Sequence, residues 1–192
     1  MTEVKLTKEN VSEAYKVADD KVKRVLDALF GKAKIRPTLD DYTTIRTYED
    51  ACEALGEDEI DEECLHEAGC PNHIIALMKL ERISKALWGR NFEPIPDAEG
   101  RKYFYYPYFC LYTQDEMKNM SADDCGALLA ADALTGAYTG FGYLHTSNRS
   151  SYSHAATGFR LCQETETKAS YFGKQFIRLW AEYYTFNFKI KD

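Results

Sequence analysis

The sequence predicts an α+β fold in which helices pack mainly on one face of an antiparallel sheet. Two observations support this class. Apolar residues recur at three- and four-residue steps before residue 90 and again after residue 165, as they do in helices. Between these parts lie a long aromatic segment and pieces rich in glycine and serine, with the short alternating patterns that are typical of strands.

A long N-terminal helix is predicted between Thr7 and Gly31. Thr7 can cap its first turn, and Gly31 stands where a C-terminal cap would lie. A short helix is then predicted from Thr47, because Asp50 lies three residues further on and Gly56 can end it. These two helices open the helical part of the chain.

Long helices are also predicted in the centre and near the C-terminus. Pro71 suits a first helical turn, and a broad apolar stripe runs from there to Trp88, just before Gly89. The last helix follows Thr165. Gly173 inside it costs about 1 kcal/mol against alanine, which indicates close packing against another part of the backbone.

The segment Tyr103–Tyr112 is predicted to be a strand with rings on both sides. Side chains alternate along a strand, so two sets form. One set is Tyr103, Tyr105, Pro107, Phe109 and Leu111, and the other is Phe104, Tyr106, Tyr108, Cys110 and Tyr112. Because proline cannot donate a ladder hydrogen bond, Pro107 places this strand at a sheet edge or at a bulge.

Helical turns are expected after this strand. Thr113 with Glu116, and Ser121 with Asp124, both match the start of a capped helix and lead into the alanine-rich segment CGALLAADAL. Further strands are predicted around 138–145 and 159–163, with a polar turn near 147–150. One domain is therefore expected for residues 1–192, with a helical part at about 7–90 and a sheet with its C-terminal helix at about 101–188.

Composition limits the classes of function. The formal net charge is −7, which argues against a simple DNA-coating role, and ten acidic residues lie between Arg46 and Lys79 with no basic residue among them. No apolar run reaches the roughly 18 residues of a membrane span, and the first residues have no secretory hydrophobic core. A cytoplasmic protein is expected. Its six cysteines are expected to be reduced thiols.

The surplus of rings in the aromatic strand has two interpretations. The strand can be buried on one face by helices and partly shielded on the other by loops. Alternatively, six rings form a stacking surface for a base, a sugar or a protein partner. These rings are Tyr106, Tyr108, Tyr112, Tyr138, Phe141 and Tyr143. The exposure of the rings decides between the two interpretations.

A zinc site is a further hypothesis. Cys64, His66, Cys70 and His73 follow the spacing C-x-H-x3-C-x2-H and could supply four thiolate or imidazole ligands, with Cys52 nearby. The spacing matches no standard zinc pattern. Separate thiols and surface histidines are therefore the favoured interpretation, and no cofactor is expected.

Signals for catalysis are weak. The chain has no Gly-x-Ser-x-Gly elbow and no phosphate-binding glycine loop. His145 and His154 could act as acid and base across a phosphate, although a polar hairpin turn would have the same composition.

Three segments together suggest a family: TKENVSEAYKVADDKVKRVLDALFG, ALMKLERISKALWGRNFEPIPDAEGRKYFYYPYFCLYTQDE and GFRLCQETETKASYFGKQFIRLWAEYY. In these segments the chain resembles a group of uncharacterised proteins associated with phages, prophages and mobile elements of gut Bacteroidales. The resemblance implies a phage-linked context, in the cytoplasm of an infected or lysogenic bacterium or in the virion. It implies no catalytic residues.

The leading hypothesis is a non-enzymatic phage or prophage accessory protein, or a minor virion protein, that binds a host or phage protein through its tyrosine-rich sheet face. One alternative is a binder of nucleotides or other small ligands, in which stacked rings hold a base and Arg149 or Arg160 meets phosphate. A second alternative is an enzyme that uses His145 and His154. A homodimer is also expected if a large aromatic face is left uncovered.

Overall fold

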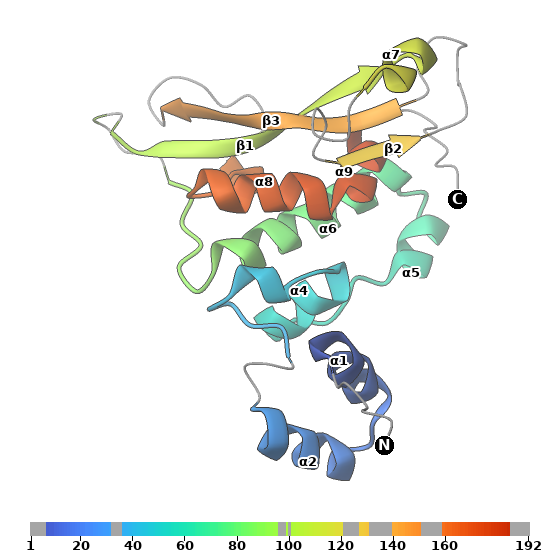
Figure 1. Cartoon of the computed structure of the whole chain (residues 1–192), viewed down its shortest axis with the longest axis vertical. Helices are drawn as coiled ribbons and strands as arrows, with labels where there is room; N and C mark the ends of the chain where they lie inside the picture. The colour runs from blue at the N-terminus through green and yellow to red at the C-terminus, as the bar shows by residue number, and fades with distance from the viewer. Residues whose placement is uncertain are drawn as a thin grey trace.

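The structure is a computed structural model that describes residues 7–31, 36–95, 99, 101–120, 127–130, 140–150 and 159–184. The sheet lies at one end of the molecule, with α8 and α9 directly beneath it (Figure 1). Helix α6 forms the next layer, and α4 lies beyond it. Helices α1 and α2 form an arm at the opposite end. The α+β class predicted from the sequence is confirmed.

The N-terminal segment forms two helices, α1 (Lys8–Val17) and α2 (Asp20–Phe30), so the prediction of one long helix is wrong. Ala18 is extended, and the Asp19 side chain caps α2 by accepting hydrogen bonds from the backbone N–H groups of residues 21 and 22 at 3.0 and 2.9 Å. A carboxylate at this position stabilises a new helix start more than it would a continuing helix. The expected cap at Thr7 is confirmed, since it accepts from Asn10 N–H.

Helices α4 (Tyr48–Leu55), α5 (Glu62–Glu67) and α6 (Asn72–Trp88) follow, with a short 3₁₀ turn η1 (Tyr42–Thr44) before them. Thr47 and Asp50 form the predicted capping box of α4, and Gly56 ends it in the left-handed region with φ 68°. The acidic segment after α4 includes the helix α5. Asp61 caps α5 by accepting from Cys64 N–H at 2.9 Å.

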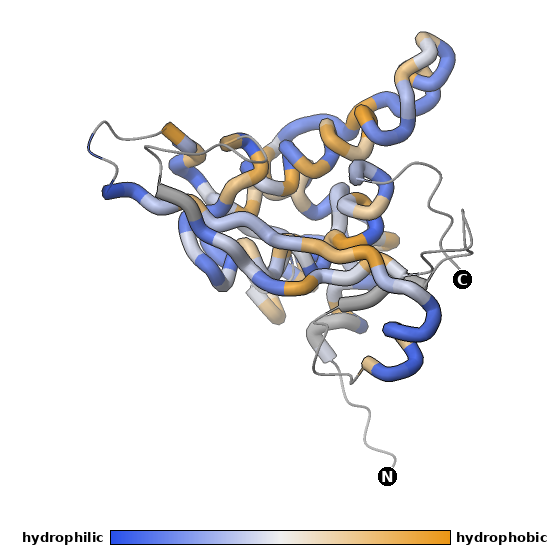
Figure 2. The backbone as a smooth tube through the Cα atoms, turned by 90° about the horizontal axis from the view of Figure 1, so that it is seen from above, coloured by the Kyte–Doolittle hydropathy of each residue, from blue (hydrophilic) through white to orange (hydrophobic). Residues whose placement is uncertain are grey.

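The sheet has three described strands in the order β1–β3–β2, and both pairings are antiparallel. Strands β1 (Tyr103–Tyr112), β2 (Ala127–Ala130) and β3 (Gly140–Ser150) are seen from above in Figure 2, in front of the helices. Two predictions are wrong here: Ala127–Ala130 is a strand and not a helix, and residues 147–150 belong to β3 and not to a turn. Residues 147–150 extend β3 because they pair with the first residues of β1. Backbone pairing does not depend on the polarity of the side chains, so a polar segment can form this part of the strand.

Strand β1 is an edge strand of the described sheet, as Pro107 predicts. Tyr105 directs its backbone away from β3 and exchanges hydrogen bonds of 3.0 and 2.9 Å with Gln163. Pro107 lies two residues further on and directs its nitrogen to the same side, so β3 loses no hydrogen bond. A register shift between Tyr108 and Phe109 marks a bulge.

The segment around 159–163, predicted to be a strand, is the 3₁₀ turn η2 (Phe159–Leu161) followed by the single bridge from Gln163. The expected C-terminal helix is divided at Phe176 into α8 (Glu166–Gln175) and α9 (Ile177–Tyr184). The predicted capping box at Thr113 and Glu116 is confirmed and opens α7 (Gln114–Lys118). The second helix signature, at 121–124, lies outside the described residues.

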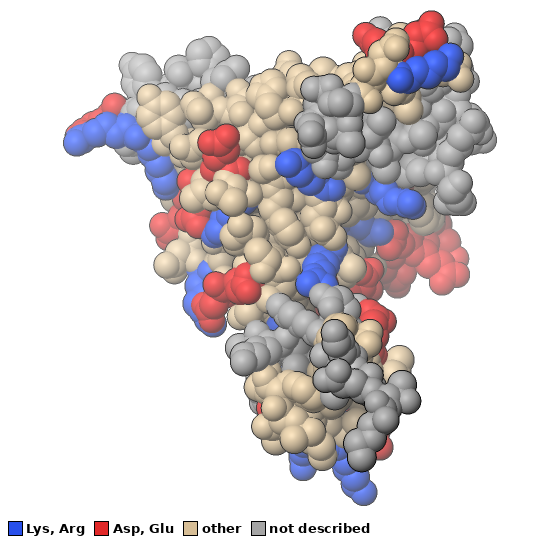
Figure 3. Space-filling view, in the orientation of Figure 1, with Lys and Arg blue, Asp and Glu red and all other residues tan. Residues whose placement is uncertain are grey.

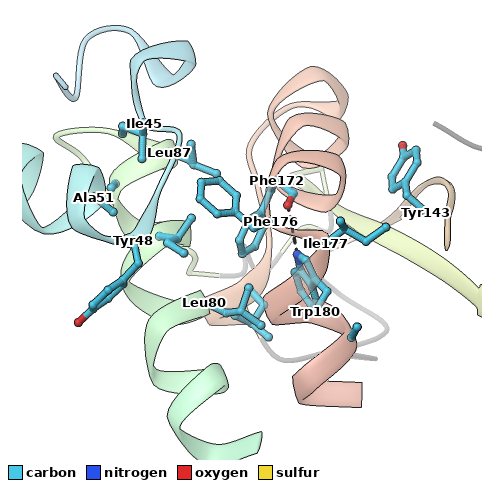
Figure 4. Packing of buried hydrophobic residues seen from close by; sticks show 14 of the residues in the cluster. Ile45, Tyr48, Ala51, Leu80, Leu87, Tyr143, Phe172, Phe176, Ile177 and Trp180 are labelled. Atoms are coloured by element: carbon cyan, nitrogen blue, oxygen red, sulfur yellow. Dashed lines mark hydrogen bonds between the residues drawn. The ribbon is translucent and has the colours of Figure 1, made fainter. Parts of the chain in front are cut away.

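The main core joins α4, α6, α8, α9 and β3. Trp180 is 1% exposed and contacts the Phe172 ring at 4.9 Å between centroids, while its indole N–H donates to the Phe172 carbonyl at 3.2 Å. Figure 4 shows Phe176 and Trp180 between side chains of α6 and Tyr143 of the sheet, with the hydroxyl of Tyr48 pointing away from the cluster. The helices therefore bury one face of the sheet.

Candidate functional site

Phe109, Phe141 and Tyr143 line the face of the sheet that the helices cover. The Phe109 ring stacks on Phe141 with centroids 4.9 Å apart and lies 5.2 Å from the ring of Trp180. Phe141 and Tyr143 are both buried. These two members of the predicted binding set therefore belong to the core.

Gly173 allows α8 to approach this face closely. A Cβ atom at this position would lie 2.6 Å from the Cβ atom of Pro107 and 2.6 Å from a ring carbon of Tyr143. The close packing that the sequence predicted is present, although its nearest atoms belong to side chains. Any larger residue must displace β1 or β3.

The opposite side of β1 is covered over its first half. Phe104 and Tyr106 are buried in a second cluster with Trp88 and Cys162. Burial raises the pKa of the Tyr106 hydroxyl well above its usual value and raises the pKa of the Cys162 thiol to about 12. Tyr106, a predicted binding residue, therefore presents no ring surface to a partner.

Tyr108 is the predicted ring that stays at the surface. Its residue is 52% exposed, and its ring stacks on His145 of β3 with centroids 5.0 Å and planes 26° apart. At the bulge, the neighbouring Leu144 is 39% exposed. We call Tyr108, Leu144 and His145 the sheet window. Strands β1 and β3 contain one charged residue, Arg149, and Figure 3 shows mainly uncharged atoms along the sheet in this view.

The other predicted binding residues are dispersed. Tyr112 is half-buried at the end of β1, and Tyr138 lies outside the described residues. The backbone of Arg149 in β3 lies opposite Phe104 of β1, and the Arg149 side chain is outside the described part. Arg160, in η2, is exposed and lies in a cleft beside α6. Among the described side chains of this set, Tyr108 alone lies in the sheet window.

The cysteine and histidine set lies near the start of α6. Cys64 and His66 are exposed on α5, Cys70 precedes α6, and His73 is in its first turn. Among the described residues there is no group of three or more histidine, cysteine or acidic side chains placed to hold a metal ion. Of the two histidines in the enzyme hypothesis, His145 stacks on Tyr108, and His154 lies outside the described residues.

Helix α2 carries an exposed apolar stripe that sequence reasoning missed. Val22, Val25 and Leu29 lie at helical spacing on one side of α2, and Leu29 is 69% exposed. The neighbouring Leu26 and Phe30 pack against Val11 and Tyr15 of α1. Helix α1 thus covers only part of the apolar face of α2.

Arg36 connects this arm to the body of the protein. Its Nε donates to the Tyr15 hydroxyl at 2.6 Å, and its guanidinium lies 4.8 Å from the centre of the Tyr15 ring. The same guanidinium forms an ion pair with Glu53 of α4 at 3.9 Å. These contacts fix the arm beside α4.

A cleft of about 520 Å³ lies along the exposed side of α6. Its residues come from the segment after α4, from α6, from the segment after α6 and from η2. They are Glu57, Ile60, Met78, Glu81, Arg82, Lys85, Phe92 and Arg160. Of these residues, the sequence predicted only Arg160 as a binding residue. Glu57 and Phe92 lie outside α6 in the sequence and come next to it only in the folded protein.

Comparisons of the chain with protein-family models, with curated proteins and with solved structures find no match. Within the described ranges, no helix is both long and apolar enough to cross a membrane.

Proposed function

We propose that the chain is a non-enzymatic phage or prophage accessory protein, or a minor virion protein, that binds a host or phage protein. The observation that carries this proposal is the sheet window: an exposed tyrosine, stacked on histidine beside an exposed leucine, on strands with almost no charge. Aromatic residues with an apolar body and a polar tip are enriched at protein interfaces. The resemblance to phage-associated proteins supplies the biological context.

The chemistry of the window favours a protein over a nucleic acid. One side of the Tyr108 ring is already occupied by His145, so a single ring face and an aliphatic neighbour are available. Nucleic-acid surfaces combine stacked rings with a track of basic residues. Arg149 is the one charged residue of the two strands, and the net charge of the chain is −7.

The test uses a double variant, Tyr108→Asp with Leu144→Asp, against Tyr103→Asp as a matched control. Tyr103 is an exposed tyrosine at the first position of the same strand. Wild-type protein on beads should enrich a partner from infected cells, the double variant should lose it, and the control should keep it. Titration of that purified partner should show at least a tenfold weaker Kd for the double variant, since anchor residues typically cost more than about 1.4 kcal/mol.

Circular dichroism and thermal melting should show that all three proteins are folded. If wild-type protein enriches no partner, or if the double variant binds the purified partner with the wild-type Kd, the sheet window is not the binding surface.

A further inference from the structure

The cleft along α6 has the size of a small-ligand site. Its volume of about 520 Å³ lies within the range of roughly 300–1,000 Å³ that is usual for ligand pockets. Met78, Arg82 and Lys85 lie three or four residues apart and therefore share one side of α6. This side of the helix forms the base of the cleft. The segment after α4 forms one wall, and η2 with Phe92 contributes to the other.

Arg82 is fixed in place by its neighbours. Its Nη1 donates to the Tyr48 hydroxyl at 2.8 Å and to the carbonyl of Asp58, and its Nε pairs with Glu57 at 3.1 Å. Its side chain is 22% exposed. A guanidinium held by three groups contributes a preorganised positive charge to the base of the cleft.

Two other cations are more accessible. The Arg160 side chain is 75% exposed, and its one described ion pair, to Glu81, is long at 3.5 Å. The Lys85 side chain is 44% exposed and pairs with Glu57. Three cations and two carboxylates line the cleft, which gives a local charge of 3 − 2 = +1 in a chain of net charge −7. The cleft therefore favours an anion.

The apolar part of the cleft consists of Ile60, Met78 and Phe92. Phe92 is held by Trp88 in an edge-to-face contact, with ring centroids 5.6 Å apart. Apolar side chains that solvent can reach, next to an exposed guanidinium, suit a ligand with a planar apolar group and an anionic group.

We propose that this cleft binds a small aromatic phosphate monoester, of which a nucleoside monophosphate is the simplest biological form. The phosphate would lie between Arg160 and Lys85, because a guanidinium binds phosphate oxygens through paired hydrogen bonds. The ring would lie against Met78 and Phe92. This site is separate from the sheet window and does not depend on it.

The surroundings restrict the ligand to a small one. A second hollow shares Glu57 with the cleft and is lined by six carboxylates. They are Glu49, Asp50, Glu53, Glu57, Asp58 and Glu59. A longer polyanion, such as a nucleic acid, would be repelled where it extended toward this side.

The experiment measures binding of four probes by calorimetry: AMP, phenyl phosphate, adenosine and inorganic phosphate. AMP and phenyl phosphate should bind with a Kd below about 1 mM. Adenosine lacks the anion and inorganic phosphate lacks the ring, so each should bind at least tenfold more weakly than AMP. No saturable binding of either ester, or equal binding of inorganic phosphate, would overturn the proposal.

Variants locate the site. Arg160→Ala and Lys85→Ala should each weaken AMP at least tenfold. Arg178→Ala, which removes an exposed arginine on α9 outside the cleft, should leave the Kd unchanged. Because the Arg160 side chain is largely exposed and the Lys85 side chain is about half exposed, both variants should melt close to the wild-type temperature. Wild-type affinity in Arg160→Ala would show that any binding occurs elsewhere.

Discussion

Strand β1 and helix α2 both carry more apolar side chains than one covered face requires, but they differ in how many neighbours they have. Helices α8 and α9 cover one side of β1, and Trp88 with Cys162 covers the first half of the other. Among the described elements, helix α2 packs its buried side against α1, and Val25 and Leu29 remain exposed. The number of packed layers, and not the apolar content of a segment, decides what is buried.

The largest expected effect is at the junction of the sheet and the helices. Trp180→Ala should lower the free energy of unfolding by about 3–5 kcal/mol, because it leaves a cavity beside Phe109 and Phe172 and removes an indole hydrogen bond. Urea unfolding measures this value. A loss below about 1 kcal/mol would contradict the tight packing described for this face.

Gly173 provides a sharper test of the same junction. Gly173→Ala should destabilise the protein and Gly173→Val more so, with losses of about 1–3 kcal/mol, because the first added carbon already meets Pro107 and Tyr143. Helix propensity alone predicts the opposite sign, a gain of about 1 kcal/mol for alanine. A stabilised Gly173→Ala protein would show that α8 and β1 are further apart than described.

The burial of Cys162 beside β1 should make the free energy of unfolding fall at alkaline pH. Burial raises the folded-state pKa of Cys162 from about 9 to about 12, so the neutral thiol is favoured in the fold. Its contribution to stability is complete below pH 9 and is lost as the pH rises from 9 toward 12. Burial also raises the pKa of Tyr171 and of Tyr184 from about 10 to about 12, so their contributions begin to fall only above pH 10.

Urea unfolding at pH 8, 9 and 10 with a reducing agent checks this expectation. Stability should fall between pH 9 and 10 in the wild-type protein and fall less steeply in Cys162→Ala. The two slopes must be compared, since the substitution itself changes stability at every pH. Equal slopes would exclude Cys162 as the source.

The smallest effect is expected on the arm. Leu29→Ser should change the free energy of unfolding by no more than about 0.5 kcal/mol, because the side chain has little contact to lose. Leu26→Ser, on the side of α2 that faces α1, should cost more. A loss above about 1 kcal/mol for Leu29→Ser would mean that something covers the stripe, and sedimentation velocity would then show whether it is a second copy of the chain.

Local signals predicted much of the fold. The capping boxes at Thr47 and Thr113 and the end of α6 at Gly89 are each set by a few neighbouring residues, and all three predictions are confirmed. The break at Asp19 was also a local signal, but the regular apolar spacing on both sides of it masked the cap. By contrast, Ala127–Ala130 is a strand because it pairs with β3, which local propensity does not reveal.

The candidate surfaces were harder to predict because their neighbours are distant in sequence. Tyr106 is covered by Trp88 and Cys162, and nothing near Tyr106 in the chain indicates this. The cleft could have been suspected from Arg82 and Lys85, which share one side of a predicted helix. Arg160 is distant from them in sequence and meets them only in the folded protein.

Pro107 has a consequence for behaviour at high concentration. Chains that stack edge to edge extend each other's ladders through outward N–H and C=O groups, and this is how native sheets begin to polymerise. The nitrogen of Pro107, near the middle of β1, points outward and carries no hydrogen. Tyr105 is already bonded to Gln163, so an incoming strand would find no donor between Tyr105 and Phe109. The protein can therefore keep an aromatic edge strand with little tendency to form fibrils through it.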